Sequence, residues 1–177
     1  MYKILFKSVL YELNIKKIMD IFSIATSFCL VTVTTAEKSV IRVELSENMY
    51  PEKSKEIKDI ELYEKCVKEF SEYFSGIRKE FTLPYAYSLP PFYSKVLHEL
   101  KKIPYGQLIS YKNLSSKAGN IKAVRACGRA CHCNPLPLII PCHRVTASNG
   151  IGGYAYGTEV KRKLLEIEGI KIPDEKQ

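Results

Sequence analysis

The second half of this 177-residue chain is short of acidic residues. From Lys101 to Thr158 there is no aspartate or glutamate, whereas residues 1–84 carry 13 acidic and 13 basic side chains. Residues 85–177 hold 14 Lys and Arg against 6 Asp and Glu, which accounts for the whole formal charge of +8. Such a span indicates a polyanionic partner, and we favour nucleic acid over an ordinary solvated basic face. Its basic residues, expected to contact phosphates, are Lys101, Lys102, Lys112, Lys117, Lys122, Arg125, Arg129 and Arg144.

The chain also lacks a long apolar run. Its richest apolar segment, residues 21–33, is interrupted by Ser and Thr and falls short of the roughly 18 apolar residues of a membrane helix. The first 20 residues are punctuated by lysine and show no apolar stretch before a small-residue cleavage site, so we expect no secretory signal. We therefore expect mostly reduced cysteines, a cytoplasmic location and no membrane attachment.

Paired metal-ligand motifs are missing as well. Cys127, Cys131 and Cys133 lie near His132, but their spacing does not give the two knuckles that structural zinc sites use. We expect neither a metal nor a cofactor, and the sequence leaves open whether Cys29 pairs with Cys66.

What is present predicts an α+β chain of two parts. Residues 28–34 and 39–45 alternate in the manner of two antiparallel strands, and residues 57–74 show apolar spacings of three and four, which indicate a helix. Prolines in residues 82–91 coincide with the shift in charge. We therefore expect a structural α/β domain with a short antiparallel sheet in residues 1–84, and a mainly helical domain in residues 85–177.

The second part reads as a series of short helices. We expect them at residues 92–102, 111–118, 121–131 and 159–168, with Ser110 as an N-cap and Gly169 just past the end. Gly119-Asn120 forms a tight turn between the middle two, which is the shape of a helix-turn-helix in a winged-helix-like domain. Ordinary helical hairpins share this shape, and the basic surroundings favour the DNA-binding interpretation.

The pentad Pro-Cys-His-Arg-Val at residues 141–145 is the strongest chemical motif. It follows an apolar run and precedes a loop of Gly and small polar residues. A thiolate is the nucleophilic form of cysteine, and His143 and Arg144 next to Cys142 favour that form. A Cys-His pair alone is more often chance or a buried core cysteine, but the surroundings favour a nucleophile.

These motifs together resemble one known family, the O6-alkylguanine-DNA alkyltransferases, also called methylated-DNA–protein-cysteine methyltransferases. The resemblance covers residues 70–170 well and residues 20–70 only loosely. Its motifs are residues 73–81, Pro91-Phe92, residues 103–106, Ser110-Tyr111, residues 123–126, residues 134–136, residues 139–145, residues 152–154 and residues 164–169.

The resemblance implies DNA repair by direct damage reversal. A monomer would transfer a methyl or other alkyl group from O6-alkylguanine, and from O4-methylthymine, in double-stranded DNA to Cys142, irreversibly and once per molecule. His143 would act as general base through a water, oriented by the Glu168 carboxylate. Tyr111 would donate a hydrogen bond to the base, and Asn134 matches a buried hinge asparagine.

The resemblance also assigns the DNA and substrate contacts. The guanine must leave the base stack, and Arg125 would fill the hole from a helix of small residues in the minor groove. The expected DNA contacts are Tyr111, Lys112, Asn120, Arg125, Arg129 and Ser148, and the expected pocket walls are Val145, Gly153, Tyr154, Ala155 and Tyr156. Tyr156 replaces a common glycine and would narrow the pocket. The zinc site of some members is not recognisable, since residues 1–84 hold two cysteines and no histidine.

Two other functions fit parts of the pattern. Alkyltransferase-like proteins bind alkylated guanine without repairing it, but they replace the cysteine that stands here at position 142. A Cys-His thiol hydrolase would turn over many times and needs no basic groove. Product formed per protein molecule separates the three functions as none, one or many.

Overall fold

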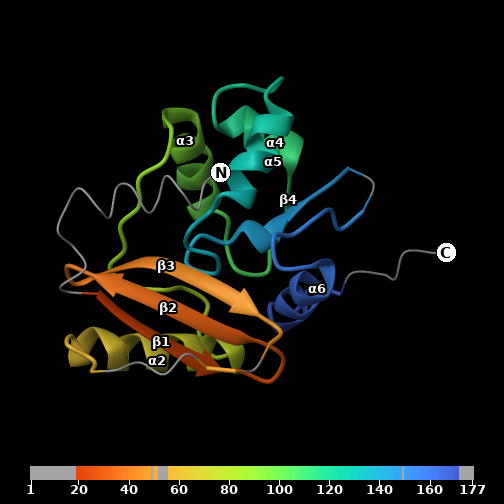
Figure 1. Cartoon of the computed structure of the whole chain (residues 1–177). Helices are drawn as coiled ribbons and strands as arrows, with labels where there is room; N and C mark the ends of the chain where they lie inside the picture. Colours follow the sequence, from red (N-terminus) through yellow and green to blue (C-terminus); the bar gives the residue numbers. More distant parts are fainter. Residues whose placement is uncertain (1–18, 49, 52–55, 149, 172–177) are drawn as a thin grey trace.

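A three-stranded antiparallel sheet and a set of short helices make up the chain. The structure, a computed structural model, describes residues 19–48, 50–51, 56–148 and 150–171. The sheet has the order β1-β2-β3, with β1 at Met19–Ala25, β2 at Leu30–Ala36 and β3 at Ser39–Ser46. Helix α2 (Ile60–Phe74) lies against one side of the sheet (Figure 1). Helices α3 (Pro91–Lys101), α4 (Tyr111–Lys117) and α5 (Val124–His132) gather on the opposite side beyond β3, and α6 (Thr158–Ile167) lies near one end of the strands (Figure 1). No helix in these described ranges is long and apolar enough to cross a membrane.

The predicted hairpin of β2 and β3 is confirmed. Ala36 pairs with Ser39, and the two residues between them, Glu37 and Lys38, have φ angles of 49° and 60°. Two central residues with positive φ give the turn whose twist matches the strands it joins. Strand β1 was not predicted, because its inward-facing positions begin with Asp20, which interrupts the apolar alternation. The Asp20 carboxylate is buried and accepts hydrogen bonds from the backbone N–H groups of Lys58 and Asp59.

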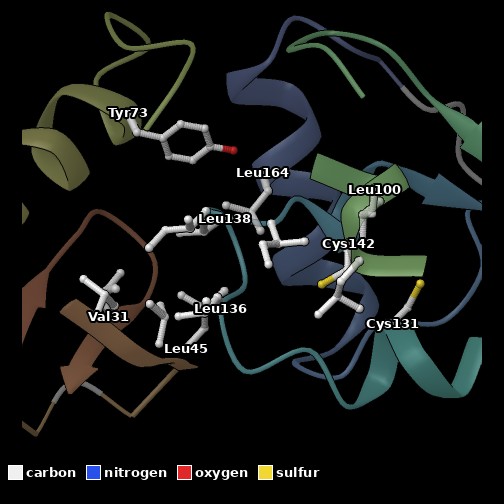
Figure 2. Packing of buried hydrophobic residues seen from close by; sticks show 14 of the residues in the cluster. Val31, Leu45, Tyr73, Leu100, Cys131, Leu136, Leu138, Cys142 and Leu164 are labelled. Atoms are coloured by element: carbon white, nitrogen blue, oxygen red, sulfur yellow. The ribbon is translucent and has the colours of Figure 1, made fainter. Parts of the chain in front are cut away.

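Helix α2 brings an aromatic residue from the first half of the chain to the second. Asp59 caps it by accepting a hydrogen bond from the Leu62 backbone at 3.0 Å, so it begins three residues later than predicted. Its buried positions include Cys66, Phe70 and Tyr73, one face of the helix as predicted. The ring of Tyr73 extends from the last turn of α2 toward Leu164 (Figure 2).

The helices of the second half follow the predicted order. They are α3 (Pro91–Lys101), α4 (Tyr111–Lys117), α5 (Val124–His132) and α6 (Thr158–Ile167). Helix α5 starts later than predicted because residues 121–123 still belong to a turn, in which the Ala123 backbone N–H donates to the Asn120 carbonyl at 3.0 Å. Helices α4 and α5 pack together in the helix-turn-helix order, and their assignment to that motif stays a prediction.

Two short strands connect the pentad to the start of α4. Strand β4 (Ile109–Ser110) pairs in parallel with β5 (Val145–Thr146), joining Ile109 to Val145 and Ser110 to Thr146. This pair places the end of the pentad beside the first residues of α4. Nothing in the sequence predicted it, because a two-residue strand carries no periodicity.

The apolar run before the pentad is a series of turns rather than a strand. Leu138 has a φ of 73°, which is uncommon for a residue with a side chain, and the Ile140 N–H donates to the Leu136 carbonyl at 2.8 Å. Leu136 and Leu138 lie between the sheet residues Val31 and Leu45 and Leu164 of α6 (Figure 2). Residues on both sides of position 85 therefore share one core, and the expected domain boundary there stays a prediction.

Replacing the Ser110 cap should destabilise the second half. The Ser110 hydroxyl accepts a hydrogen bond from the Asn113 backbone at 3.1 Å, as the sequence predicted for an N-cap. Ser110→Ala should lower the free energy of unfolding by about 1 kcal/mol in urea titrations, because that N–H loses its partner. Ser110→Thr keeps a hydroxyl and should lose much less. Equal stability of the alanine variant and the parent protein would contradict a capping role.

Candidate active site

Cys142 lies at the start of a short 3-10 helix, η2 (Cys142–Arg144), directly after the apolar turns. Asn134 holds this approach in place: its amide Nδ2 donates to the Ile140 carbonyl at 2.7 Å and to the Cys142 Sγ at 3.3 Å. The Asn134 side-chain oxygen also accepts from the Leu136 backbone at 3.0 Å. One buried amide thus fixes the turn and directs a hydrogen-bond donor at the sulfur, and the hinge role of this asparagine stays a prediction.

The environment of Cys142 favours the thiol over the thiolate at rest. Burial raises the pKa of Cys142, and the Asn134 amide and the positive charge of Lys161 oppose that rise without cancelling it. The sulfur therefore needs a proton acceptor before it can attack a carbon atom.

His143 and Glu168 form a buried pair beside the cysteine. The His143 Nε2 atom lies 2.7 Å from the Glu168 Oε1 atom, and neither side chain is exposed. A carboxylate can only accept, so Nε2 carries the proton and Nδ1 keeps a lone pair. Among the described residues, Nδ1 has no hydrogen-bond partner. Burial lowers the pKa of His143 although Glu168 opposes this, so the ring is neutral at pH 7 and can accept a proton at Nδ1.

Glu168 is also bound by Arg144. The Arg144 Nε atom donates to Oε2 at 2.9 Å, its Nη2 atom donates to Oε1 at 2.9 Å, and the Gly106 backbone N–H donates to Oε2 at 3.1 Å. Burial alone would raise the pKa of Glu168, but the contacts with His143 and Arg144 lower it to about 2. Glu168 is therefore a carboxylate throughout the physiological range.

Two of the eight basic residues expected on the phosphates are used inside the protein instead. Arg144 is buried and bound to Glu168, and the Lys101 Nζ atom, half-buried, donates to the Ile139 carbonyl at 3.0 Å. The expectation for Arg144 was wrong because its acidic partner lies 24 residues further along the chain, outside the acid-free span.

A buried lysine of α6, which sequence reasoning missed, binds the loop that follows the pentad. Lys161 of α6 has no exposed surface, and its Nζ atom donates to the carbonyls of Val145 and Ile151, both at 2.6 Å, and of Gly153 at 3.3 Å. Burial lowers its pKa to about 8. The ammonium group joins both ends of the loop that follows the pentad. A signal was present, since Lys161 falls on the same helical face as Leu164 and Leu165.

A cavity of about 260 Å³ opens onto Cys142. The expected residues Tyr111, Gly153, Tyr154 and Ala155 line it, joined by Gly128, Cys131 and His132, which sequence reasoning did not place there. Val145 and Tyr156, expected in the walls, lie outside the lining. The Val145 side chain is buried in the core, and the Tyr156 hydroxyl donates to the Val43 carbonyl of the sheet at 3.4 Å. Tyr156 therefore does not narrow this cavity.

Gly128 of α5 faces the tyrosine of the cavity wall. A Cβ atom at this position would lie 3.8 Å from the Tyr111 ring, in ordinary van der Waals contact. The Tyr111 hydroxyl lies 3.4 Å from the Gly153 carbonyl, to which it donates. The ring thus spans the cavity from α4 to the loop after the pentad.

Most of the residues expected to contact DNA lie at the surface, and Tyr111 also lines the cavity. Arg125 and Arg129 on α5, Lys112 on α4, Asn120 in the turn and Ser148 in the loop are all solvent-exposed, and Tyr111 is half-buried. Within the described ranges no three His, Cys, Asp or Glu side chains are grouped as metal ligands, and the six cysteines are free thiols.

The chain is similar to known alkyl-transfer proteins. A family model described as the DNA-binding domain of 6-O-methylguanine DNA methyltransferase matches residues 91–170. A methylated-DNA–protein-cysteine methyltransferase of Metallosphaera sedula is 43% identical over 109 residues, covering 60% of this chain and 69% of that protein. A protein of the same name from Saccharolobus islandicus is 46% identical over 102 residues. The match covers 58% of this chain and 66% of that protein, so the chain spans just under two thirds of the length of this relative.

Solved structures extend the similarity to the first half of the chain. The O6-methylguanine methyltransferase of Mycobacterium tuberculosis superposes with a TM-score of 0.73 at 26% identity, covering 89% of this chain and 97% of that one. A structure of the Mycobacterium tuberculosis protein in complex with DNA gives a TM-score of 0.74 at 28% identity, and the match covers 84% of this chain and 92% of that one. Both have the mixed α+β fold expected from the sequence.

Acid should destabilise the protein through the buried pair. Both His143 and Glu168 have lowered pKa values in the folded state, so below pH 6.5 the unfolded chain binds more protons and stability falls with pH. Glu168 alone should account for a loss of about 3 kcal/mol between pH 5 and pH 2. Urea titrations across this range should show a shallower acid dependence for Glu168→Gln than for the exposed control Glu159→Gln. Identical pH slopes would rule out a lowered pKa for Glu168.

Proposed function

Because the chain belongs to the methylated-DNA–protein-cysteine methyltransferase family, we propose that it repairs DNA by moving an alkyl group from O6 of guanine to Cys142. The same transfer from O4-methylthymine is part of the proposal. The observation that carries it is the position of Cys142, which opens onto a cavity while its neighbour His143 is oriented by a buried carboxylate.

The chemistry follows from these groups. The His143 Nδ1 atom takes the thiol proton through a water, and Glu168 stabilises the imidazolium that forms. The Cys142 sulfur attacks the alkyl carbon, a carbon–sulfur bond forms, the carbon–oxygen bond breaks, and its electron pair leaves with guanine. The Tyr111 hydroxyl, which lines the same cavity and donates to the Gly153 carbonyl at 3.4 Å in the free protein, turns from that carbonyl to donate a hydrogen bond to the departing base. The product is a stable thioether, so each molecule reacts once.

The base must turn out of the duplex to reach the cavity. Arg125 is exposed on α5, the helix that also supplies Gly128 and His132 to the cavity lining. From this position its side chain would occupy the space left by the base. The phosphate contacts come from the basic residues that remain at the surface, which are Lys102, Lys112, Lys117, Lys122, Arg125 and Arg129.

The proposal extends to the molecule as a whole. Residues 1–84 form a structural domain, residues 85–177 form the DNA-binding and transfer domain, and the protein acts as a monomer in the cytoplasm. Six free thiols, among them the acceptor Cys142, support a reducing compartment.

Intact mass after reaction tests the stoichiometry. Incubation with duplex DNA containing O6-methylguanine should add one methyl group per molecule, and peptide mapping should place it on Cys142. Cys142→Ser should gain no methyl group yet bind the duplex with similar affinity, since the sulfur contributes chemistry and the basic face contributes binding. Repeated turnover would favour the thiol hydrolase, and binding without transfer by the parent protein would favour the non-repairing module.

Arg125 should matter only when a base is taken from a duplex. Arg125→Ala should slow single-turnover repair of duplex DNA about tenfold or more while leaving the reaction with free O6-benzylguanine nearly unchanged, since unstacking costs a few kcal/mol and a free base leaves no hole. Lys122→Ala removes a neighbouring positive charge from the surface and is the matched control. Equal rate losses on the two substrates would refute the proposed role.

A further inference from the structure

A tyrosine from the first half of the chain contacts the catalytic pair. Tyr73 lies in the last turn of α2, outside residues 91–170 that the family model matches, and has no exposed surface. Its hydroxyl donates to the Glu168 Oε1 atom at 2.8 Å and lies 3.3 Å from the His143 Nε2 atom. The ring points from α2 toward α6, the helix whose C-cap residue is Glu168 (Figure 2).

Tyr73 and His143 bind the same carboxylate oxygen. Oε1 accepts from Tyr73 at 2.8 Å, from the His143 Nε2 atom at 2.7 Å and from the Arg144 Nη2 atom at 2.9 Å. Each hydrogen bond to Oε1 neutralises part of the negative charge of that oxygen. A donor added beside His143 therefore reduces the charge that remains to stabilise an imidazolium.

The orientation of Glu168 does not depend on the tyrosine. Arg144 binds both carboxylate oxygens, and the Gly106 backbone holds Oε2 at 3.1 Å. Loss of the Tyr73 hydroxyl alone would leave these contacts in place. Its particular contribution is therefore the hydrogen bond to Oε1.

The other ionisable groups around His143 either raise or lower its pKa. Glu168 favours its protonated form, whereas Arg144 in the same turn and Lys161 from α6 disfavour it. Cys142 is the preceding residue, and the hydroxyl of Tyr105, from the segment after α3, donates to the Ile167 carbonyl at 2.6 Å instead of to Glu168. Tyr73 itself is a neutral donor, since burial and the Glu168 charge raise its pKa well above the usual range.

We propose that Tyr73 is a positioning residue that keeps the nucleophile unreactive at rest. It donates to the carboxylate oxygen that also binds His143, so Glu168 stabilises the protonated imidazole less and Cys142 stays a thiol. This rests on the proposed function, because it explains how an acceptor that reacts only once avoids premature alkylation. The first half of the chain thereby sets the reactivity of a site otherwise built from the second half.

Tyr73→Phe removes the hydroxyl and keeps the ring, and two readouts follow its effect. The chain has three histidines, so the His143 ring can be followed by NMR during a pH titration, with His98→Gln and His132→Gln for assignment. Its pKa should rise by about one unit, the equivalent of one charge-assisted hydrogen bond. The alkylation rate of Cys142 by iodoacetamide near pH 7, followed by peptide mass, should rise about tenfold, since more thiolate is then present.

Tyr105→Phe is the matched control, because it removes a nearby hydroxyl that donates to the Ile167 carbonyl instead of to Glu168. It should move neither readout. Site-specific 3-fluorotyrosine at position 73 is a stronger donor of nearly the same shape, so it should lower the His143 pKa and slow alkylation. This variant also serves should the phenylalanine variant not fold.

The proposal is overturned if Tyr73→Phe leaves the His143 pKa unchanged or lowers it, if Tyr105→Phe shifts it equally, or if fluorotyrosine has no opposite effect. None of these measurements uses DNA. A failure of alkyl transfer from DNA would overturn the proposed function and leave these readouts intact.

Discussion

The structure around the site depends on one buried carboxylate, that of Glu168. A buried charge is tolerated only where it is paired and hydrogen-bonded. Glu168 meets this requirement with four donor residues from three separate segments: Tyr73 of α2, the Gly106 backbone, and His143 and Arg144 of the pentad. Because these donors come from both halves of the chain, the burial of Glu168 ties the position of α2 to that of the pentad.

The cysteine is placed by a second set of buried polar groups. Asn134 and Lys161 donate to backbone carbonyls of the segments before and after Cys142, and both lie close enough to influence its sulfur. Because unpaired buried carbonyls are costly, these side chains are needed for folding whatever the chemistry. The groups that hold the loop thus supply the amide dipole and the positive charge that lower the cost of forming a thiolate.

Sequence reasoning reached the local features and missed the long-range ones. The β2–β3 hairpin, the Ser110 cap and the helix order follow from neighbouring residues, and the structure confirms them. The pairing of His143 with Glu168 was expected only from the family resemblance. Arg144 was misassigned because a basic residue in an acid-free span looks like a phosphate ligand until its distant partner is known. The pairing of Tyr73 with Glu168 spans 95 positions, and no local pattern indicates it.

Helix α5 joins recognition to chemistry through its periodicity. Arg125 and Arg129 are four residues apart and exposed, whereas Gly128 and His132, also four apart, line the cavity with Cys131. Residues four apart share a helical face, so one face of α5 is directed at solvent and the adjoining face at the alkyl acceptor. Under the proposed function, one face of this helix would serve DNA binding and the adjoining face would serve alkyl transfer.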